Sequence, residues 1–382
     1  MKTKFLMAPM FPATGAISLF KRHLLLLLAI CVLIPSAQAH SLFVTAQDSN
    51  TVAVIDSSTD QVTTTIQVGA NPIRICVSPD RRKAYVSNSG SGTVSVIDTV
   101  ALSPTITATI PVGSAPGESA VTPDGTRLFV VHQSSAPVDV IDTTTNLVIA
   151  SIPIGGNLAK DILFSRNGRC AYIANYSEGT VNVIDTTMLT PPYRVKTIPT
   201  GAGPRRLALS PAGDRVWVTN YLDNSVSVID TRTKSLITTI SVGIGPRGIA
   251  ITPSGDAIYV TNVGNGTVSI INSATLMVTN TIRVGAWPWQ ILITPDGTRA
   301  FVSNSGSGTV SVIDTALQQV IQTLNTDPGP FFSVTNPEQN KLYVSDSLST
   351  TVMVFDISSM TASELAKIPN VGAQPFDLVF GL

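Results

Sequence analysis

The amino-acid sequence predicts an all-β protein folded as a propeller of four-stranded blades, and three observations support this prediction. First, an apolar residue followed by Asp or Asn recurs with spacings of 42, 44, 43, 45, 42, 42 and 42 residues, a period that suits one blade. Second, each period contains short runs rich in β-branched and aromatic residues, separated by turns rich in Gly and Pro. Third, no segment after residue 39 shows a sustained helical period, so we expect no helix there. The recurring pairs are Ile55-Asp56, Ile97-Asp98, Ile141-Asp142, Ile184-Asp185, Ile229-Asp230, Ile271-Asn272, Ile313-Asp314 and Phe355-Asp356.

The period that begins at Pro246 shows the four strands expected of each blade. Its first strand is PRGIAITP, which the turn PSGD separates from a second strand, AIYVTN. The Gly-rich turn VGNG leads to a third strand, TVSIIN, and the fourth strand is MVTNTIRVG. We expect the first strand to be innermost and the fourth to lie at the rim.

Recurring polar residues at the turns have a structural interpretation. The sequence TPDG, at residues 122–125 and 294–297, places Pro and Gly where a tight turn needs their backbone angles. The Asp-Thr pair after the third strand, as at Asp98-Thr99, can bond to nearby backbone amides and hold the next turn. Because one such acid recurs in each of eight periods, we interpret these residues as structural and not catalytic.

The two ends of the repeat region complete each other. The first unit starts directly with a second strand, SLFVTAQ, and the last residues, QPFDLVFGL, supply the missing first strand. Pairing these segments closes the ring and removes two exposed strand edges. With this strand counted, the repeat favours eight blades, and seven is the alternative if one terminal unit is not a true blade.

The first 39 residues are predicted to be a secretory signal. Lys21-Arg22 precede an apolar run from Leu24 to Ile34, and Ala37-Gln38-Ala39 is a small-x-small cleavage site. The run has 11 residues, fewer than a membrane-spanning helix needs. Translation from Met7 or Met10 and an uncleaved membrane anchor are the alternatives.

This organisation predicts a signal peptide over residues 1–39 and a propeller domain over residues 40–382. We expect the propeller to be periplasmic, secreted or at the cell surface, with no membrane contact after cleavage. The propeller region carries 20 basic and 24 acidic residues, so its charge does not suit nucleic acid. We expect a monomer, without a disulfide between Cys76 and Cys170, because these fall in non-equivalent strands of different repeats.

A four-residue motif ends several of the predicted second strands. It reads Tyr259-Val260-Thr261-Asn262, and variants occur at residues 85–88, 217–220 and 343–346. The motif resembles that of the YVTN-type β-propeller repeat family of prokaryotic surface and periplasmic proteins, and the resemblance extends over nearly all of the chain after residue 39. It implies an extracytoplasmic propeller, usually of seven blades. The wider propeller group includes lactonases and subunits of redox enzymes, whose site residues are not matched here.

The sequence predicts no catalytic residue, no metal site and no cofactor. After the signal, His132 is the only internal histidine, and it occupies the position that Asn88 and Asn175 hold in other repeats. We therefore interpret His132 as a polar strand-end residue. Clusters of His and Cys for transition metals, a C-x-x-C-H haem motif, a calcium loop and a phosphate loop are all lacking.

The first residues of the innermost strands differ between blades and are the predicted ligand-binding site. Because strand directions alternate, these residues surround the mouth of the central channel. One side of the mouth is basic and the opposite side is aromatic, which suits an anionic and partly apolar partner. In the alternative interpretation, the aromatic residues plug the channel and the arginines pair with Glu118, Asp161 or Asp377. The predicted site residues are Arg74, Lys160, Arg205, Arg206, Arg247, Trp287, Trp289, Phe331, Phe332 and Phe376.

Three functions remain open at this stage. We favour a non-catalytic binding or scaffold propeller that recognises a protein, a glycan or a small anionic ligand at the channel mouth. A lactonase-like hydrolase is the first alternative. The second alternative, suggested by the low charge, is a surface-layer structural protein. The hydrolase would use an acid–base set drawn from His132, Glu118, Asp161 and Arg206.

Overall fold

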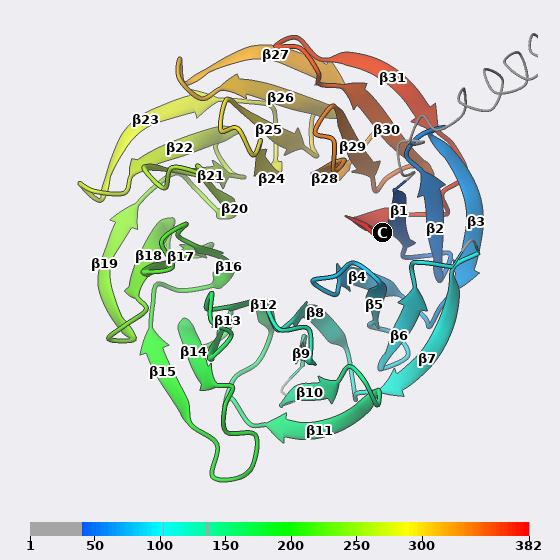
Figure 1. Ribbon diagram of the computed structural model, residues 1–382. Coiled ribbons are helices and arrows are strands. Elements are labelled where there is room, and N and C mark those ends of the chain that lie inside the picture. Colours follow the sequence, from blue (N-terminus) through cyan, green and yellow to red (C-terminus); the bar gives the residue numbers. More distant parts are fainter. Residues whose placement is uncertain (1–39, 102, 135–136, 382) are drawn as a thin grey trace, which may run out of the picture. The chain divides into compact units, whose positions relative to one another are not determined.

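The described residues after position 39 form a ring of eight four-stranded antiparallel sheets (Figure 1), which confirms the predicted all-β propeller and its count of eight blades. The computed structural model describes residues 40–101, 103–134 and 137–381, and the predicted signal segment lies outside them. Blade 1 consists of β32, β1, β2 and β3, and blades 2 to 8 each take four consecutive strands from β4 onward. In the described part of the chain no helix is long and apolar enough to cross a membrane.

The strands are β1 Ser41–Ala46, β2 Thr51–Asp56, β3 Gln61–Gln67, β4 Pro72–Val77, β5 Lys83–Asn88, β6 Thr93–Asp98, β7 Thr105–Pro111, β8 Pro116–Val121, β9 Arg127–His132, β10 Val138–Asp142, β11 Leu147–Ile152, β12 Ala159–Phe164, β13 Cys170–Asn175, β14 Thr180–Asp185, β15 Val195–Pro199, β16 Pro204–Leu209, β17 Arg215–Asn220, β18 Ser225–Asp230, β19 Ser235–Ser241, β20 Pro246–Ile251, β21 Ala257–Asn262, β22 Thr267–Asn272, β23 Met277–Arg283, β24 Pro288–Ile293, β25 Arg299–Asn304, β26 Thr309–Asp314, β27 Gln319–Asn325, β28 Pro330–Thr335, β29 Lys341–Asp346, β30 Thr351–Asp356, β31 Ser363–Ile368 and β32 Pro375–Phe380. In every blade except the first, the innermost strand comes first in sequence.

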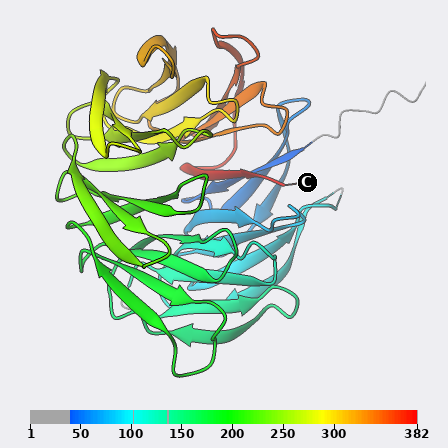
Figure 2. The same cartoon turned by 60° about the vertical axis from the view of Figure 1, so that its left-hand side comes forward.

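The C-terminal strand closes the ring as the sequence predicts. β32 pairs antiparallel with β1, placing Leu42 opposite Phe380 and Val44 opposite Leu378. Figures 1 and 2 both show β32 (red) beside β1 (blue), so the two ends of the described chain share blade 1. The closed ring buries the edges that both segments would otherwise expose.

The core lies between neighbouring blades, and it is filled by an aromatic residue that recurs at one position of the second strand in all eight blades. Each of these eight aromatic side chains is at most 1% exposed. Phe43 of blade 1, for example, packs in one cluster with Ile75 and Val86 of blade 2. Large side chains at this position fill the wedge between two sheets, which accounts for the aromatic residue at the head of the repeat motif. The eight residues are Phe43, Tyr85, Phe129, Tyr172, Trp217, Tyr259, Phe301 and Tyr343.

The Asn that ends the repeat motif joins the second strand to the third. The Asn88 amide donates to the Thr93 hydroxyl at 3.0 Å and to the Ser95 hydroxyl at 2.9 Å. The same two bonds recur in blades 5, 6 and 7. Blade 8 has Asp346 at this position, fully buried, with its Oδ1 atom lacking a partner among the described residues.

Both cysteines of the described region are free, as the sequence predicts.

The turns form the hydrogen bonds and backbone angles that their sequences predict. In the TPDG turn, the Thr122 hydroxyl donates to Asp124 at 2.5 Å, and Gly125 has a positive φ of 76°. At the end of the third strand, Asp98 accepts the Val100 amide at 2.9 Å. These bonds confirm the structural role of the recurring acids.

Replacing Asp346 with Asn should stabilise the protein above neutral pH. Burial raises the pKa of Asp346 to about 8, and the nearby Asp327 carboxylate adds to the rise. Between the ordinary carboxyl pKa, about 4, and that value, the folded state holds a proton that the unfolded state has released, so stability falls as pH rises. We expect Asp346→Asn to melt about 5 °C above the wild type at pH 8, and the gain to shrink towards pH 5.

The measurement is a series of thermal melts from pH 5 to 9, with Asp48→Asn as the control because Asp48 is an exposed acid in a turn. A gain that stays constant over this range would show that the Asp346 carboxyl does not titrate within it.

Candidate functional site

A β-bulge at the start of each innermost strand brings two consecutive side chains to the channel. In blade 2, Pro72 pairs with Asn88 and Arg74 pairs with Ser87, which leaves Ile73 as the extra residue. Side chains of a regular strand alternate between its faces, and the bulge interrupts that alternation. As a result, Ile73 and Arg74 both line the same cavity.

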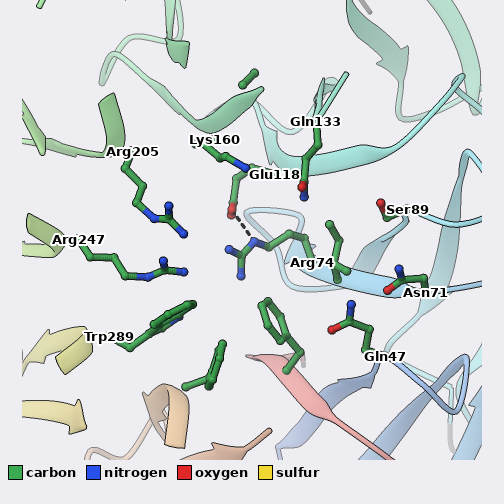
Figure 3. A pocket seen from close by; sticks show the side chains of 14 residues that line it. Gln47, Asn71, Arg74, Ser89, Glu118, Gln133, Lys160, Arg205, Arg247 and Trp289 are labelled. Atoms are coloured by element: carbon green, nitrogen blue, oxygen red, sulfur yellow. Dashed lines mark ion pairs between the residues drawn. The ribbon is translucent and has the colours of Figure 1, made fainter. Parts of the chain in front are cut away.

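The first of the two positions forms what we call the outer tier, at the mouth of the channel. Blades 4 to 6 place three cations in this tier, and blades 7, 8 and 1 continue the ring with three aromatic side chains. Figure 3 shows Trp289 beside Arg247, so the basic and aromatic parts of the mouth adjoin. The outer tier consists of Ile73, Gly117, Lys160, Arg205, Arg247, Trp289, Phe331 and Phe376. All of these except Gly117 line a cavity of about 360 Å³, which we call the mouth cavity.

The second position forms the inner tier, one step deeper in the channel. It holds three acids where the outer tier has none. All of its residues except Arg74 line a further cavity of about 360 Å³, the channel cavity. Glu118, Arg247 and Trp289 line both cavities, so the two spaces adjoin. The inner tier consists of Arg74, Glu118, Asp161, Arg206, Gly248, Gln290, Phe332 and Asp377.

Ion pairs across the channel join Glu118 to the two inner-tier arginines. Its Oε2 atom lies 2.7 Å from Arg74 Nε and 3.1 Å from Arg206 Nη1. Arg206 Nη1 also lies 3.4 Å from Asp161 Oδ1. Burial opposes the charge on Arg206, but its carboxylate neighbours raise the pKa of its guanidinium above the ordinary value.

Asp161 and Asp377 also accept hydrogen bonds from the backbone of the neighbouring blade. Asp161 Oδ2 accepts the backbone amide of Leu207 in the next blade at 2.8 Å, and Asp377 Oδ2 accepts that of Ile75 at 3.3 Å. These amides lie on innermost strands, which have no further strand on the channel side to accept them. Burial raises the pKa of both aspartates to about 6, against the lowering effect of the nearby arginines.

The three outer-tier cations have no acid to neutralise them. Within the described residues, no carboxylate oxygen lies within 4.0 Å of Lys160, Arg205 or Arg247. Their neighbours are aromatic rings: Lys160 lies 5.8 Å from the Tyr176 ring and Arg205 lies 5.2 Å from the Tyr221 ring. Such contacts stabilise a cation less than a desolvated carboxylate partner does.

Arg247 has the least favourable electrostatic environment of these three cations. Its side chain stacks on Trp289, 2.9 Å from the ring centroid, and the residue is only 8% exposed. Burial lowers the pKa of Arg247, and so do the positive charges of Arg205, Arg206 and Arg74. Because a guanidinium keeps its proton in proteins, this lowering expresses an unfavourable electrostatic free energy that a bound anion would relieve.

The aromatic side chains of the mouth form a continuous row of tilted rings. The ring centroids of Trp289 and Phe331 lie 4.3 Å apart, and those of Phe331 and Phe376 lie 5.3 Å apart. Phe332 of the inner tier extends the row, 5.5 Å from Phe376. Trp289 Nε1 is buried without a hydrogen-bond partner among the described residues.

Of the ten residues predicted for the site, the structure brings nine to the two cavities. Arg206 and Phe332 line the channel cavity, and the other seven line the mouth cavity. Trp287 lines neither of them and is 63% exposed. It precedes Pro288 with a left-handed φ of 51°, and an ideal Cβ on Gly306 would lie 3.0 Å from its ring, so Trp287 lies over the backbone of the adjacent turn.

The four arginines of the predicted site fall into two groups. Arg74 and Arg206 pair with acids, as the alternative interpretation predicts. Arg205 and Arg247 stay without an acid partner among the described residues. The distinction follows the tier to which each arginine belongs, because the acids are confined to the inner tier.

His132 lies away from these cavities and is held by its own blade. Its Nε2 atom lies 3.0 Å from Asp139 Oδ2, and its Nδ1 atom lies 2.9 Å from the Ser114 carbonyl. Asp139 holds the position that Ser95 holds in blade 2, so the pair replaces the Asn–Ser bond of other blades. Of the acid–base set drawn from His132, Glu118, Asp161 and Arg206, the last three line the channel cavity together, whereas His132 lines neither cavity.

Sequence reasoning missed the residues that the loops add to the mouth cavity. Gln47, Ser89 and Gln133 directly follow the second strands of blades 1 to 3, and Asn71 directly precedes β4. Tyr176 and Tyr221 hold the corresponding loop position in blades 4 and 5. The residue that directly follows the second strand differs between blades, and this variation in the sequence could have indicated these residues.

Comparison with known proteins supports the fold and leaves the family open. Residues 184–319 match the family model "Lactonase, 7-bladed beta-propeller", and residues 123–244 match the "Cytochrome D1 heme domain". Each match covers less than half of the chain. Among curated proteins, no sequence matches significantly.

Several solved structures share the propeller at low sequence identity. The dihydro-heme d1 dehydrogenase NirN, in complex with DHE, is 15% identical with a TM-score of 0.75 over 92% of this chain and 78% of that one. AztD from Citrobacter koseri is 15% identical with a TM-score of 0.67 over 90% and 98%. The hydrazine synthase of Kuenenia stuttgartiensis is 22% identical with a TM-score of 0.61 over 75% and 96%.

Removing the charge of Glu118 should make the stability of the protein depend on salt. In Glu118→Gln, Arg74 and Arg206 lose their shared carboxylate partner and the channel gains one net positive charge. We expect the variant to lose on the order of 1–3 kcal/mol of unfolding free energy at low salt, and to recover part of it as ions screen the repulsion.

Thermal melts between low and high sodium chloride measure this effect, and Glu364→Gln, at an exposed acid of β31, is the control. A loss of equal size at every salt concentration would mean that Glu118 acts through packing alone.

Proposed function

We propose that this protein is a binding propeller that holds a small anionic ligand with a flat or apolar part in the mouth cavity. One observation carries the proposal: three cations without an acid partner among the described residues and three aromatic side chains line one cavity of about 360 Å³. That volume falls within the range of small-molecule sites. Cations fix and orient an anionic group, while aromatic rings bury an apolar face.

The charge balance of the two tiers supports an anion as the ligand. Together they hold five cations and three carboxylates, an excess of two positive charges in a partly desolvated channel. Burial lowers the pKa of Lys160, and the charges of Arg205, Arg247 and Arg74 lower it further. A bound anion would offset this repulsion, so we infer that relief of the repulsion contributes to the free energy of binding.

The setting that we propose for this function lies outside the cytoplasm. The support is the signal-like sequence of residues 1–39 and the resemblance to repeats of periplasmic and surface propellers. NirN, which shares the fold, is a dihydro-heme d1 dehydrogenase solved in complex with DHE, so haem-type carboxylates belong among the test compounds.

A hydrolase is the second candidate, because part of the chain matches a lactonase model and Glu118 lines both cavities. Glu118 Oε1 has no hydrogen-bond partner among the described residues, so it could act as a base. Turnover of a lactone panel by the wild type, lost in Glu118→Gln, would replace the binding proposal with this candidate.

Arg247→Gln should separate ligand binding from stability. The change removes the least favourable cation of the mouth, so we expect the free variant to melt no lower than the wild type. We expect it to bind benzoate or haem-type carboxylates at least about tenfold more weakly, because the guanidinium no longer contacts the anionic group.

Isothermal titration and ligand-induced thermal shifts measure both effects, with Arg283→Gln on the outer strand β23 as the control. Anion binding that is unchanged in Arg247→Gln and in Arg205→Gln would refute the mouth cavity as the site.

A further inference from the structure

We propose that the ligand is an acidic monosaccharide, a hydroxylated carboxylate of the hexuronate kind. The inference rests on the proposed function and adds a third wall to the mouth cavity. Figure 3 shows Arg205 and Arg247 entering from one side, and neutral polar side chains entering from the other. This polar wall consists of Gln47, Asn71, Ser89 and Gln133.

The polar wall is free to bind a ligand. Within the described residues, none of its four side chains has a hydrogen-bond partner, and Asn71 Oδ1 is buried in that state. Polar side chains that line a cavity and make no hydrogen bond within the protein can form hydrogen bonds to a bound molecule. The wall therefore offers a set of unused donors and acceptors.

A glycine of the outer tier makes room for this wall. At Gly117, an added Cβ would lie 3.1 Å from Gln133 Cγ, tighter than ordinary contact. Blade 3 thus has no side chain at the tier position, and the Gln133 side chain from the loop takes the space. In blade 5 the arrangement is reversed, because Arg205 fills the tier position and the loop residue Tyr221 lies beside its guanidinium, 5.2 Å from the ring centroid.

The chemistry of the wall selects hydroxyl groups. An amide side chain both donates and accepts hydrogen bonds, and so does a serine hydroxyl. Sugar hydroxyls also do both, whereas sulfate and simple carboxylates only accept hydrogen bonds, and the cations already provide donors for them. A ligand that uses all three walls therefore carries a carboxylate, several hydroxyls and an apolar face.

A hexuronate presents these three features in one ring. Its carboxylate would lie at Arg205 and Arg247, and its hydroxyls at the polar wall. One face of a sugar ring carries C–H groups, which pack against electron-rich aromatic faces such as those of Trp289 and Phe331. The mouth cavity has the volume of about a dozen water molecules, so it holds a monosaccharide and not a long chain.

Titration of the purified protein with four compounds tests the assignment. Glucuronate and galacturonate are the probes, benzoate has a carboxylate and a ring without hydroxyls, and glucose has hydroxyls without a carboxylate. We expect at least one uronate to bind at least about tenfold more tightly than both comparison compounds. In Asn71→Ala/Gln133→Ala we expect uronate affinity to fall about tenfold and benzoate affinity to stay unchanged.

The control is Gln61→Ala, on the outer strand β3. If the double variant is poorly folded, Gln47→Ala/Ser89→Ala supplies the same test from the other two residues of the wall. Benzoate binding as tight as both uronates, or uronate affinity unchanged in the wall variants, would overturn the sugar assignment while leaving the anion site in place. Glucose binding as tight as both uronates, or no binding of either carboxylate class, would overturn the anion site as well.

Discussion

Closure of the ring relies on the pairing of β32 with β1, and the other features of the molecule follow from it. Eight blades share cores only with their neighbours, so the ring is complete only when the last strand enters the first blade. The same strand carries Phe376 and Asp377 into the two tiers. Asp377 then accepts the Ile75 amide of blade 2 and lies 3.8 Å from Arg74. The strand that closes the ring therefore also places two of the residues that line the cavities.

The cations of the two tiers differ in whether carboxylates neutralise them. In the inner tier, Glu118 and Asp161 neutralise Arg206, and the aspartates also accept edge amides. The outer tier concentrates positive charge with only aromatic rings beside it. Charge without compensation is costly in a partly buried position, and proteins tolerate such cost mainly at functional sites. This contrast separates the structural part of the channel from the part available to a ligand.

Because most positions of the repeat are the same in every blade, the positions that differ between blades can be identified. The aromatic residue, the terminal Asn and the turn acid recur because each blade needs the same wedge, the same bond between strands and the same turn. Two bulge positions and the loop after the second strand vary, since the blade does not depend on them. Those varied positions line the two cavities. In the mouth cavity, blades 1 to 3 supply neutral polar side chains, blades 4 to 6 supply cations, and blades 7, 8 and 1 supply aromatic rings.

The repeat pattern was enough to predict the propeller, its eight blades, the closing strand and the nine site residues that reach the cavities, because these follow from a local period and its variation. The rest depends on tertiary contacts. Distances across the ring determine that Arg74 shares Glu118 with Arg206, while Arg247 has no acid partner among the described residues. Trp287 lies over the turn at Gly306 and outside the mouth cavity, and the space above Gly117 admits Gln133. Such outcomes depend on contacts between segments far apart in sequence, which no repeat pattern encodes.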